Sequence, residues 1–347
     1  MDDPFPNLAR LYLPLLAHAQ PQVRRQACMI LLGTYGHRAL TYVRRLIDDS
    51  DPQVRQNARL ALLAVAEVTN LGITFQPFRG MYIQCLGRMR VYMDNHEIQA
   101  QDWAQADHGR AGWQKVQSVF AYLIHSGRRG ATRDVIGTAV WGGPFSANSL
   151  SRTFTTLRQT LIKACGPAFV ERALMITDEY CVFDPAYYHT DVQLYEHTFD
   201  AAVRLEQESG LEAAVPIYRQ AMHLYGGPYM ADVPRGSGWS QHRRDHLMNS
   251  FMIAAERIAE YTYSQGHYKQ CIAVCVTALD TDAAADEIIV WLMRAYAHEG
   301  RQAELEQVYR RYARALRIDL DALVDRQDPV VQVYQSIGKS RVVNNSS

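Results

Sequence analysis

The most informative pattern of apolar and polar positions is an amphipathic helix predicted over residues 146–165. Its apolar residues recur at helical spacing and share one face, which consists of Leu150, Phe154, Leu157 and Leu161. The opposite face is polar and carries Asn148, Arg152, Thr155, Thr156, Gln159 and Lys163. Such amide, hydroxyl and cationic side chains bind base edges and phosphates, and no acidic residue occurs between Asp134 and Glu171. Because an ordinary surface helix also has a polar outer face, this pattern alone leaves both interpretations open.

The first 70 residues contain an internal repeat. The sequence QPQVRRQACMILLG, which begins at Gln20, recurs as DPQVRQNARLALLA from Asp51, at an offset of 31 residues. A proline in the first turn, a small alanine and a leucine stripe predict a helix that stacks on its neighbour. Residues 1–70 therefore resemble a pair of HEAT-like repeats. Such arrays normally need about three repeats, so the pair is interpreted either as a protein-docking module or as a helical buttress.

Strand periodicity follows a linker at residues 71–80 that is punctuated by Gly, Pro and Asn. Apolar residues alternate with polar ones over residues 81–85 and again over residues 89–93, on either side of Gly87. This alternation predicts a small antiparallel sheet. Residues 94–96 are predicted as its next turn.

Helical periodicity begins at Gly112 and predicts helices over residues 112–127 and 131–141, ahead of the amphipathic helix. Gly166 and Pro167 mark the end of the amphipathic helix. Residues 169–184 are predicted as two short strands around a turn. The expected order is therefore a small sheet, three helices and a terminal hairpin.

From residue 190 to residue 336 the pattern is helical throughout. Three similar segments begin at Gly210, Gly266 and Gly300, and the last two lie 34 residues apart, which is the tetratricopeptide (TPR) period. An insertion, GPYMADVPRGSGW, lengthens the first interval. The predicted fold class is mainly α: short HEAT-like repeats, then small antiparallel sheets with three helices in an order that resembles a winged helix-turn-helix, and then a TPR-like all-α domain. The polar residues 338–347 are predicted as a disordered tail.

Residues 81–188 resemble the OmpR-type winged helix-turn-helix, in the form found in the SARP family of bacterial transcriptional activators. The likeness rests on residues 83–91, Trp103, residues 120–124, residues 133–135, Trp141, residues 148–150, residues 156–161 and Tyr180. At the wing turn this chain has Asp178 and Glu179 where the family often has a glycine before the tyrosine. Two carboxylates at that position would repel DNA phosphates, which argues against a contact between the wing and DNA.

Residues 189–337 resemble the bacterial transcriptional activator domain that follows the winged helix in SARP proteins. The matching positions are Asp191, residues 221–227, Trp239, Arg243, Leu247, Gly266, Tyr268, Glu287, Met293, Gly300 and Tyr309. The two likenesses occur in the family's order and span residues 81 to about 336.

The resemblance implies a sequence-specific regulator, an activator, that reads the major groove of double-stranded DNA with the helix 148–164. It also implies an operator of direct repeats, a homodimer and contact with RNA polymerase. The candidate DNA-contacting residues are Asn148, Ser151, Arg152, Thr155, Thr156, Arg158, Gln159, Lys163 and Arg172. The alternative is a helical-repeat interaction scaffold whose winged helix no longer binds DNA, which the acidic wing turn and the neutral charge favour.

Composition restricts the other function classes. The 347 residues carry a formal net charge of zero, so a surface for DNA must be local. The six cysteines are scattered, the N-terminus lacks an apolar leader and no long apolar run occurs, which together favour a cytoplasmic protein. His267, Cys271 and Cys275 share one helical stripe and could bind a metal, but small buried side chains are the favoured interpretation. No catalytic motif, metal or cofactor is expected.

Overall fold

The computed structural model describes residues 12–35, 39–69, 81–93, 96–99, 102–103, 112–177, 179–233, 238–324 and 328–344. The chain forms two compact units. One comprises residues 1–197 and 224–245, and the other comprises residues 198–223 and 246–347. Both units are built largely of helices, with two small sheets in the first, which confirms the predicted fold class.

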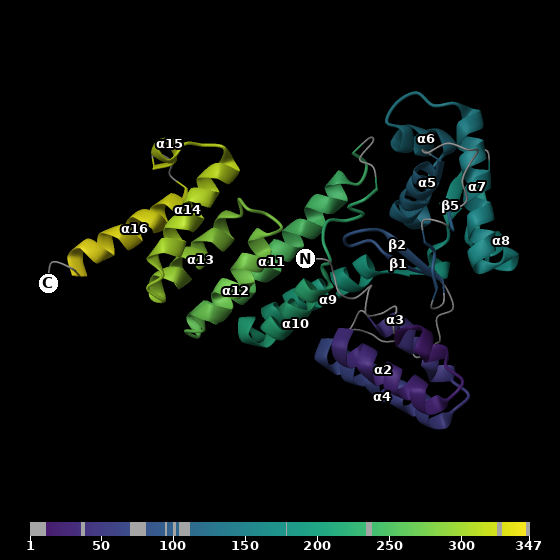
Figure 1. Cartoon of the computed structure of the whole chain (residues 1–347), viewed down its shortest axis with the longest axis horizontal. Helices are drawn as coiled ribbons and strands as arrows, with labels where there is room; N and C mark the ends of the chain where they lie inside the picture. The colour runs from purple at the N-terminus through teal and green to yellow at the C-terminus, as the bar shows by residue number, and fades with distance from the viewer. Residues whose placement is uncertain are drawn as a thin grey trace. The chain divides into compact units, whose positions relative to one another are not determined.

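The HEAT-like segment is a short helical layer in the first unit. Its elements are η1 (Pro14–Ala17), α2 (Pro21–Tyr35), α3 (Leu40–Val43), η3 (Arg44–Asp48) and α4 (Pro52–Thr69). Helices α2 and α4, drawn in purple and blue in Figure 1, pack against each other. The equivalent alanines and leucines of the repeat, Ala27, Leu31, Ala58 and Leu62, are all buried between them and their neighbours.

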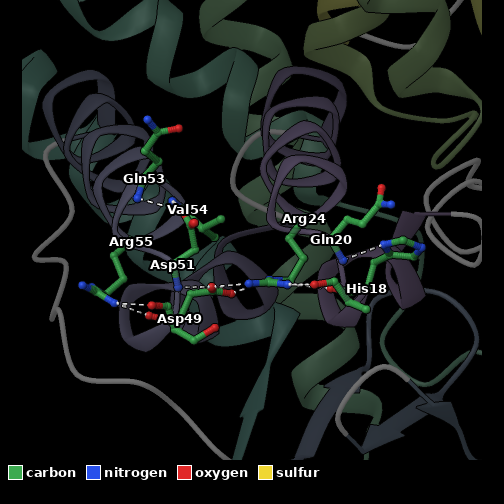
Figure 2. A network of polar contacts seen from close by, with 10 residues as sticks. His18, Gln20, Arg24, Asp49, Asp51, Gln53, Val54 and Arg55 are labelled. Carbon is green, nitrogen blue, oxygen red and sulfur yellow. Dashed lines mark hydrogen bonds and ion pairs between the residues drawn. The ribbon is translucent and has the colours of Figure 1, made fainter.

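The two repeats also make the same hydrogen bonds (Figure 2). The Nη1 of Arg24 donates to the carbonyl oxygens six and five residues before it, at 2.6 and 3.0 Å. Arg55, at the equivalent position of the second repeat, does the same at 2.6 and 3.1 Å. Arg24 joins the repeats by also donating to both carboxylate oxygens of Asp49, at 2.7 and 2.6 Å. The internal repeat seen in the sequence is therefore a repeat of structure.

The core of the HEAT-like pair continues into the sheet that follows it. The Tyr42 ring lies 5.3 Å from the Tyr82 ring and 6.4 Å from the Tyr92 ring, measured between centroids. All three tyrosines are buried in one cluster with the leucines of α2 and α4. The helical pair thus covers one face of the sheet and shares its hydrophobic core.

That sheet has four strands in the order β3-β2-β1-β6. Strand β1 (Met81–Gln84) pairs antiparallel with β2 (Arg90–Met93), with Ile83 opposite Val91. Strand β3 (His96–Glu97) follows, so the prediction that residues 94–96 are a turn is wrong for His96, which pairs with Met93. The fourth strand, β6 (Tyr188–Thr190), runs parallel to β1 and was not predicted.

The helical part of the winged helix comprises α5 (Gly112–Ser126), η4 (Gly127–Arg129), α6 (Arg133–Trp141), α7 (Ala147–Cys165) and α8 (Pro167–Ala173). The wing is the antiparallel pair β4 (Leu174–Ile176) and β5 (Cys181–Phe183), and η5 (Pro185–Tyr187) leads to β6. The prediction of a strand beginning at residue 169 is wrong. Pro167 starts a helix, and Phe169, Val170 and Ala173 are buried at helical spacing.

The described elements after β6 are helices: α9 (Asp191–Ser209), α10 (Leu211–Leu224), α11 (Gln241–Ser264), α12 (Tyr268–Leu279), α13 (Asp286–His298), α14 (Gln302–Leu316), α15 (Leu320–Val324) and α16 (Pro329–Asn344). Gly210, Gly266 and Gly300 adopt φ values of 86°, 73° and 71° in the turns that precede α10, α12 and α14. These left-handed turns explain why glycine recurs there. Helix α16 extends to Asn344, into the tail that was predicted as disordered.

The segment that begins at Asp191 is hydrogen-bonded to the turn after β1, within the first unit. The buried carboxylate of Asp191 accepts hydrogen bonds from the backbone N–H groups of Cys85 and Leu86, at 2.7 and 3.0 Å. Arg244 donates to the carbonyl oxygens of Tyr229 and Met230, at 2.7 and 2.8 Å. The turn after β1 is therefore held by residues that lie more than a hundred positions away in the chain.

Candidate nucleic-acid interface

Helix α7 is positioned by an N-terminal cap and an apolar face. The Ser146 side chain accepts a hydrogen bond from the Ser149 N–H at 3.1 Å, which satisfies one free donor of the first turn. The face predicted to be internal is buried, with Leu150, Phe154, Leu157 and Leu161 each at most 3% exposed. The opposite face of the helix is therefore the one available for a ligand.

Most of the predicted outer face is exposed. The exposed members are Asn148, Ser151, Arg152, Thr155, Gln159 and Lys163, and Arg158 is half-buried. Thr156 departs from the prediction because it is only 7% exposed. Its hydroxyl donates to the Arg152 carbonyl at 2.9 Å, and this bond within the helix lets a hydroxyl lie against the core. Thr156 is therefore not part of the outer surface.

Arg133 adds a cation that the candidate set did not include. Its Nη2 donates to the Ser151 hydroxyl at 2.6 Å, and its guanidinium lies 5.4 Å from the centre of the Phe154 ring. Arg133 is the first residue of α6, after a Thr132 cap that accepts from the Val135 N–H at 3.3 Å. No local sequence pattern marks this role, because the contact joins two helices.

The two cations at the far end of the surface differ in their surroundings. The Nζ of Lys163 lies 3.9 Å from the Asp102 carboxylate, but its side chain is 70% exposed, so this pair contributes little and the ammonium remains accessible. Arg172 lies on α8, where its Nε donates to the Ala168 carbonyl at 3.0 Å. That bond directs the Arg172 side chain along its own helix, and no described contact joins it to the outer face of α7.

The wing is held against the end of α5. The Tyr180 hydroxyl donates to the Arg129 carbonyl at 2.5 Å, and the chain also pairs at Ala131 and Cys181. Glu179 is exposed at the turn, whereas Asp178 lies outside the described residues. The structure therefore shows one exposed carboxylate at the wing turn, and its effect on DNA contact stays a prediction.

The alternative metal site at His267, Cys271 and Cys275 is not assembled. Cys271 and Cys275 are buried in α12, but His267 is exposed. Within the described ranges, no three His, Cys, Asp or Glu side chains are grouped so that they could hold a metal ion. Among the same residues, no helix has the length and apolar character needed to cross a membrane.

A winged helix followed by paired helices defines the architecture, and comparison with known proteins agrees with it. Residues 190–337 match the family model of the bacterial transcriptional activator domain, the domain that the sequence of this region resembles. A structure of Mycobacterium tuberculosis EmbR in complex with a low affinity phosphopeptide is similar to the chain, with a TM-score of 0.56 and 19% sequence identity.

The alignment with EmbR covers 75% of this chain and 65% of the EmbR chain, and at this identity it supports the fold alone. No curated protein matches the chain in sequence. The domain match agrees with the part of the resemblance that concerns residues 190–337, and the similarity to EmbR supports the fold.

Proposed function

We propose that this chain is a sequence-specific, double-stranded DNA-binding transcriptional regulator that reads the major groove with α7. The observation that carries the proposal is the exposed polar face of that helix, opposite a fully buried apolar face. The charged side chains of α7 are Arg152, Arg158 and Lys163, all of them cations. A helix of this kind fits the width of the major groove.

The order of residues along α7 assigns them different roles. Arg152 and Gln159 are two helical turns apart, about 10 Å along the axis, and side chains of these types bind guanine and adenine edges. We propose that Lys163, one turn further along, and Arg133, at the start of α6, bind phosphates. Base contacts then come from the middle of the helix and positioning contacts from its ends.

The activator domain supports activation as the outcome of DNA binding. Residues 190–337 match the model of this domain. We therefore expect the helices that follow the winged helix to contact RNA polymerase, to self-associate, or to do both. We propose a homodimer bound to direct repeats in the cytoplasm, with the winged helix at residues 81–188 and the activator domain at residues 189–337. The candidate surface has no catalytic constellation, and we propose no enzymatic activity.

A selection experiment tests this function. The full chain is incubated with fragmented genomic DNA, the bound duplexes are sequenced, and the affinity for the enriched sequence is measured at several salt concentrations. We expect a shared sequence motif and a log–log salt slope of roughly −0.9 for each phosphate neutralised. Arg204→Ala, which removes an exposed cation from α9, is the control and should leave the affinity unchanged. Recovery without any shared motif would contradict sequence-specific reading.

A second candidate function, a protein-interaction scaffold, is favoured by one observation. The outer face of α2 and α4 carries an apolar groove of about 660 Å³, in which Met29, Ile30 and Leu60 are 58%, 40% and 57% exposed. Met29 and Leu60 occupy equivalent positions of the repeat, so the groove follows from the repeat itself. Exposed apolar surface of this kind is typical of protein contacts. The two functions are compatible, because the groove and α7 lie on different elements.

A further inference from the structure

A cavity of about 490 Å³ lies at the end of α5, away from the outer face of α7. Its walls come from η4, the end of β1, β6 and the first turns of α9 and α11, all within the first unit. Its volume falls in the range of small-ligand sites. The residues that decide its chemistry are His125, Arg128, Arg129, Tyr188, Thr190 and Arg243.

Two of the arginines that line the cavity, Arg128 and Arg129, belong to η4. The backbone of this short element is fixed because the Tyr180 hydroxyl donates to the carbonyl oxygens of Arg128 and Arg129, at 3.2 and 2.5 Å. Both arginine side chains are exposed. Their main chain is therefore held in place, and both residues line the cavity while remaining exposed to solvent.

The third arginine comes from the opposite wall. Arg243 lines the cavity and donates through Nη2 to the Glu196 carboxylate at 2.7 Å. One carboxylate satisfies only part of a guanidinium, which has five N–H donors. Burial, together with the charge of Arg243, lowers the pKa of His125 to about 4, so this imidazole is neutral near pH 7. The positive charge of the cavity therefore comes from the arginines.

Apart from the Glu196 carboxylate that pairs with Arg243, no acidic side chain balances this charge among the described lining residues. Among the described residues that line it, none is Asp or Glu. Asp191, on the adjoining strand-to-helix turn, is already engaged by the N–H groups of Cys85 and Leu86. Three guanidinium groups around one cavity provide more N–H donors than the neighbouring acceptors use. Clusters of this kind bind phosphate in proteins.

We propose that this cavity binds a small molecule that carries a phosphate group, with Arg128, Arg129 and Arg243 as the anion-binding residues. The cavity is larger than a phosphate ion, so it has room for the remainder of such a ligand. Because its walls come from both the winged helix and the start of the activator segment, ligand binding gives the regulator an input separate from DNA.

Calorimetric titration of the full chain, without DNA, tests the proposal. The probes are sodium pyrophosphate and inorganic phosphate up to about 10 mM, with ionic strength held constant by sodium chloride. We expect saturable binding of one equivalent of probe. Arg128→Ala and Arg129→Ala should each weaken it at least about tenfold, whereas Arg128→Lys should retain part of the affinity. Arg88→Ala, which removes an exposed arginine of the same unit outside the cavity, is the matched control.

The proposal is overturned if neither probe binds saturably, or if Arg88→Ala weakens binding as much as the cavity variants do. Loss of duplex affinity in Arg128→Ala and Arg129→Ala, without binding of either probe, would instead assign these arginines to the DNA backbone and would also overturn it. Because the titration contains no DNA, its failure leaves the proposed DNA-binding function untouched.

Discussion

The Nη2 of Arg133 donates to the Ser151 hydroxyl at 2.6 Å, which joins the first turn of α6 to the outer face of α7. The same guanidinium lies 5.4 Å from the centre of the Phe154 ring. Arg133 therefore connects the apolar side of α7 with its polar side, and it brings a positive charge to the beginning of the proposed reading surface.

Arg133→Ala should weaken binding to every duplex by a similar factor. A phosphate contact carries no base information, so loss of one such contact should make the salt slope shallower by about one unit. Arg133→Lys keeps the charge and should restore most of the non-specific affinity. The measurement is fluorescence anisotropy on the selected operator and on a scrambled duplex. A change confined to the operator would show that Arg133 reads bases instead.

Phe154→Ala and Arg152→Ala should separate folding from recognition. Phe154 is 3% exposed in the core of the winged helix, so its truncation should lower the free energy of unfolding by about 3–5 kcal/mol. Arg152 is exposed, and its truncation should change stability by less than about 0.5 kcal/mol. Urea unfolding of both variants checks this. Equal destabilisation would contradict the assigned faces of α7.

Removal of residues 1–74 should destabilise the winged helix more than it weakens DNA binding. The deletion exposes Tyr82 and Tyr92, which are 4% and 3% exposed beneath the HEAT-like pair. Loss of an aromatic partner costs about 0.5–1.5 kcal/mol beyond the area uncovered. We expect a lower melting temperature but an operator affinity within about tenfold, or about 1.4 kcal/mol, of the full chain. A larger loss, measured where the shortened chain is folded, would place the HEAT-like pair at the DNA surface.

His125 should make the first unit sensitive to acid. Its pKa is lowered to about 4 by burial and by Arg243, whereas the unfolded chain titrates near 6.5. The unfolded state therefore binds the proton more readily, and stability should fall as the pH drops from about 6.5 to about 4, by at most about 3 kcal/mol. His125→Phe keeps a ring beside Trp239 and removes the titration. Urea unfolding at pH 7.5 and pH 4.5 should show a smaller acid loss in the variant, and an equal loss would contradict the assignment.

Periodicity predicted the elements whose burial pattern is regular. The four apolar residues of α7 and the repeat positions Ala27 and Ala58 are buried as expected, because helical spacing places them on one face. The turn glycines Gly266 and Gly300 were predicted from their regular recurrence. Both have a positive φ, which favours glycine at each turn of the repeat.

The remaining features depend on contacts between distant segments. Strand β6 has only three residues and is defined by its pairing with β1. The carboxylate of Asp191 accepts a hydrogen bond from the N–H of Cys85, which lies 106 positions earlier in the chain. Neither relationship leaves a local pattern. Thr156 was placed outside because its residue type is polar, but a bond to its own helix lets it face inward. Arg133 was missed because its contact joins two helices.

Comparison of Arg152→Ala with the parent chain, on the selected operator and on a scrambled duplex, tests most directly the claim that α7 reads DNA. We expect the operator affinity to fall by about 1–3 kcal/mol, the preference at one base position to relax, and the affinity for the scrambled duplex to change little. Gln159→Ala should relax a different position, two turns along the helix. If Arg152→Ala binds both duplexes as the parent does, α7 is not the reading helix and the interaction scaffold becomes the better account.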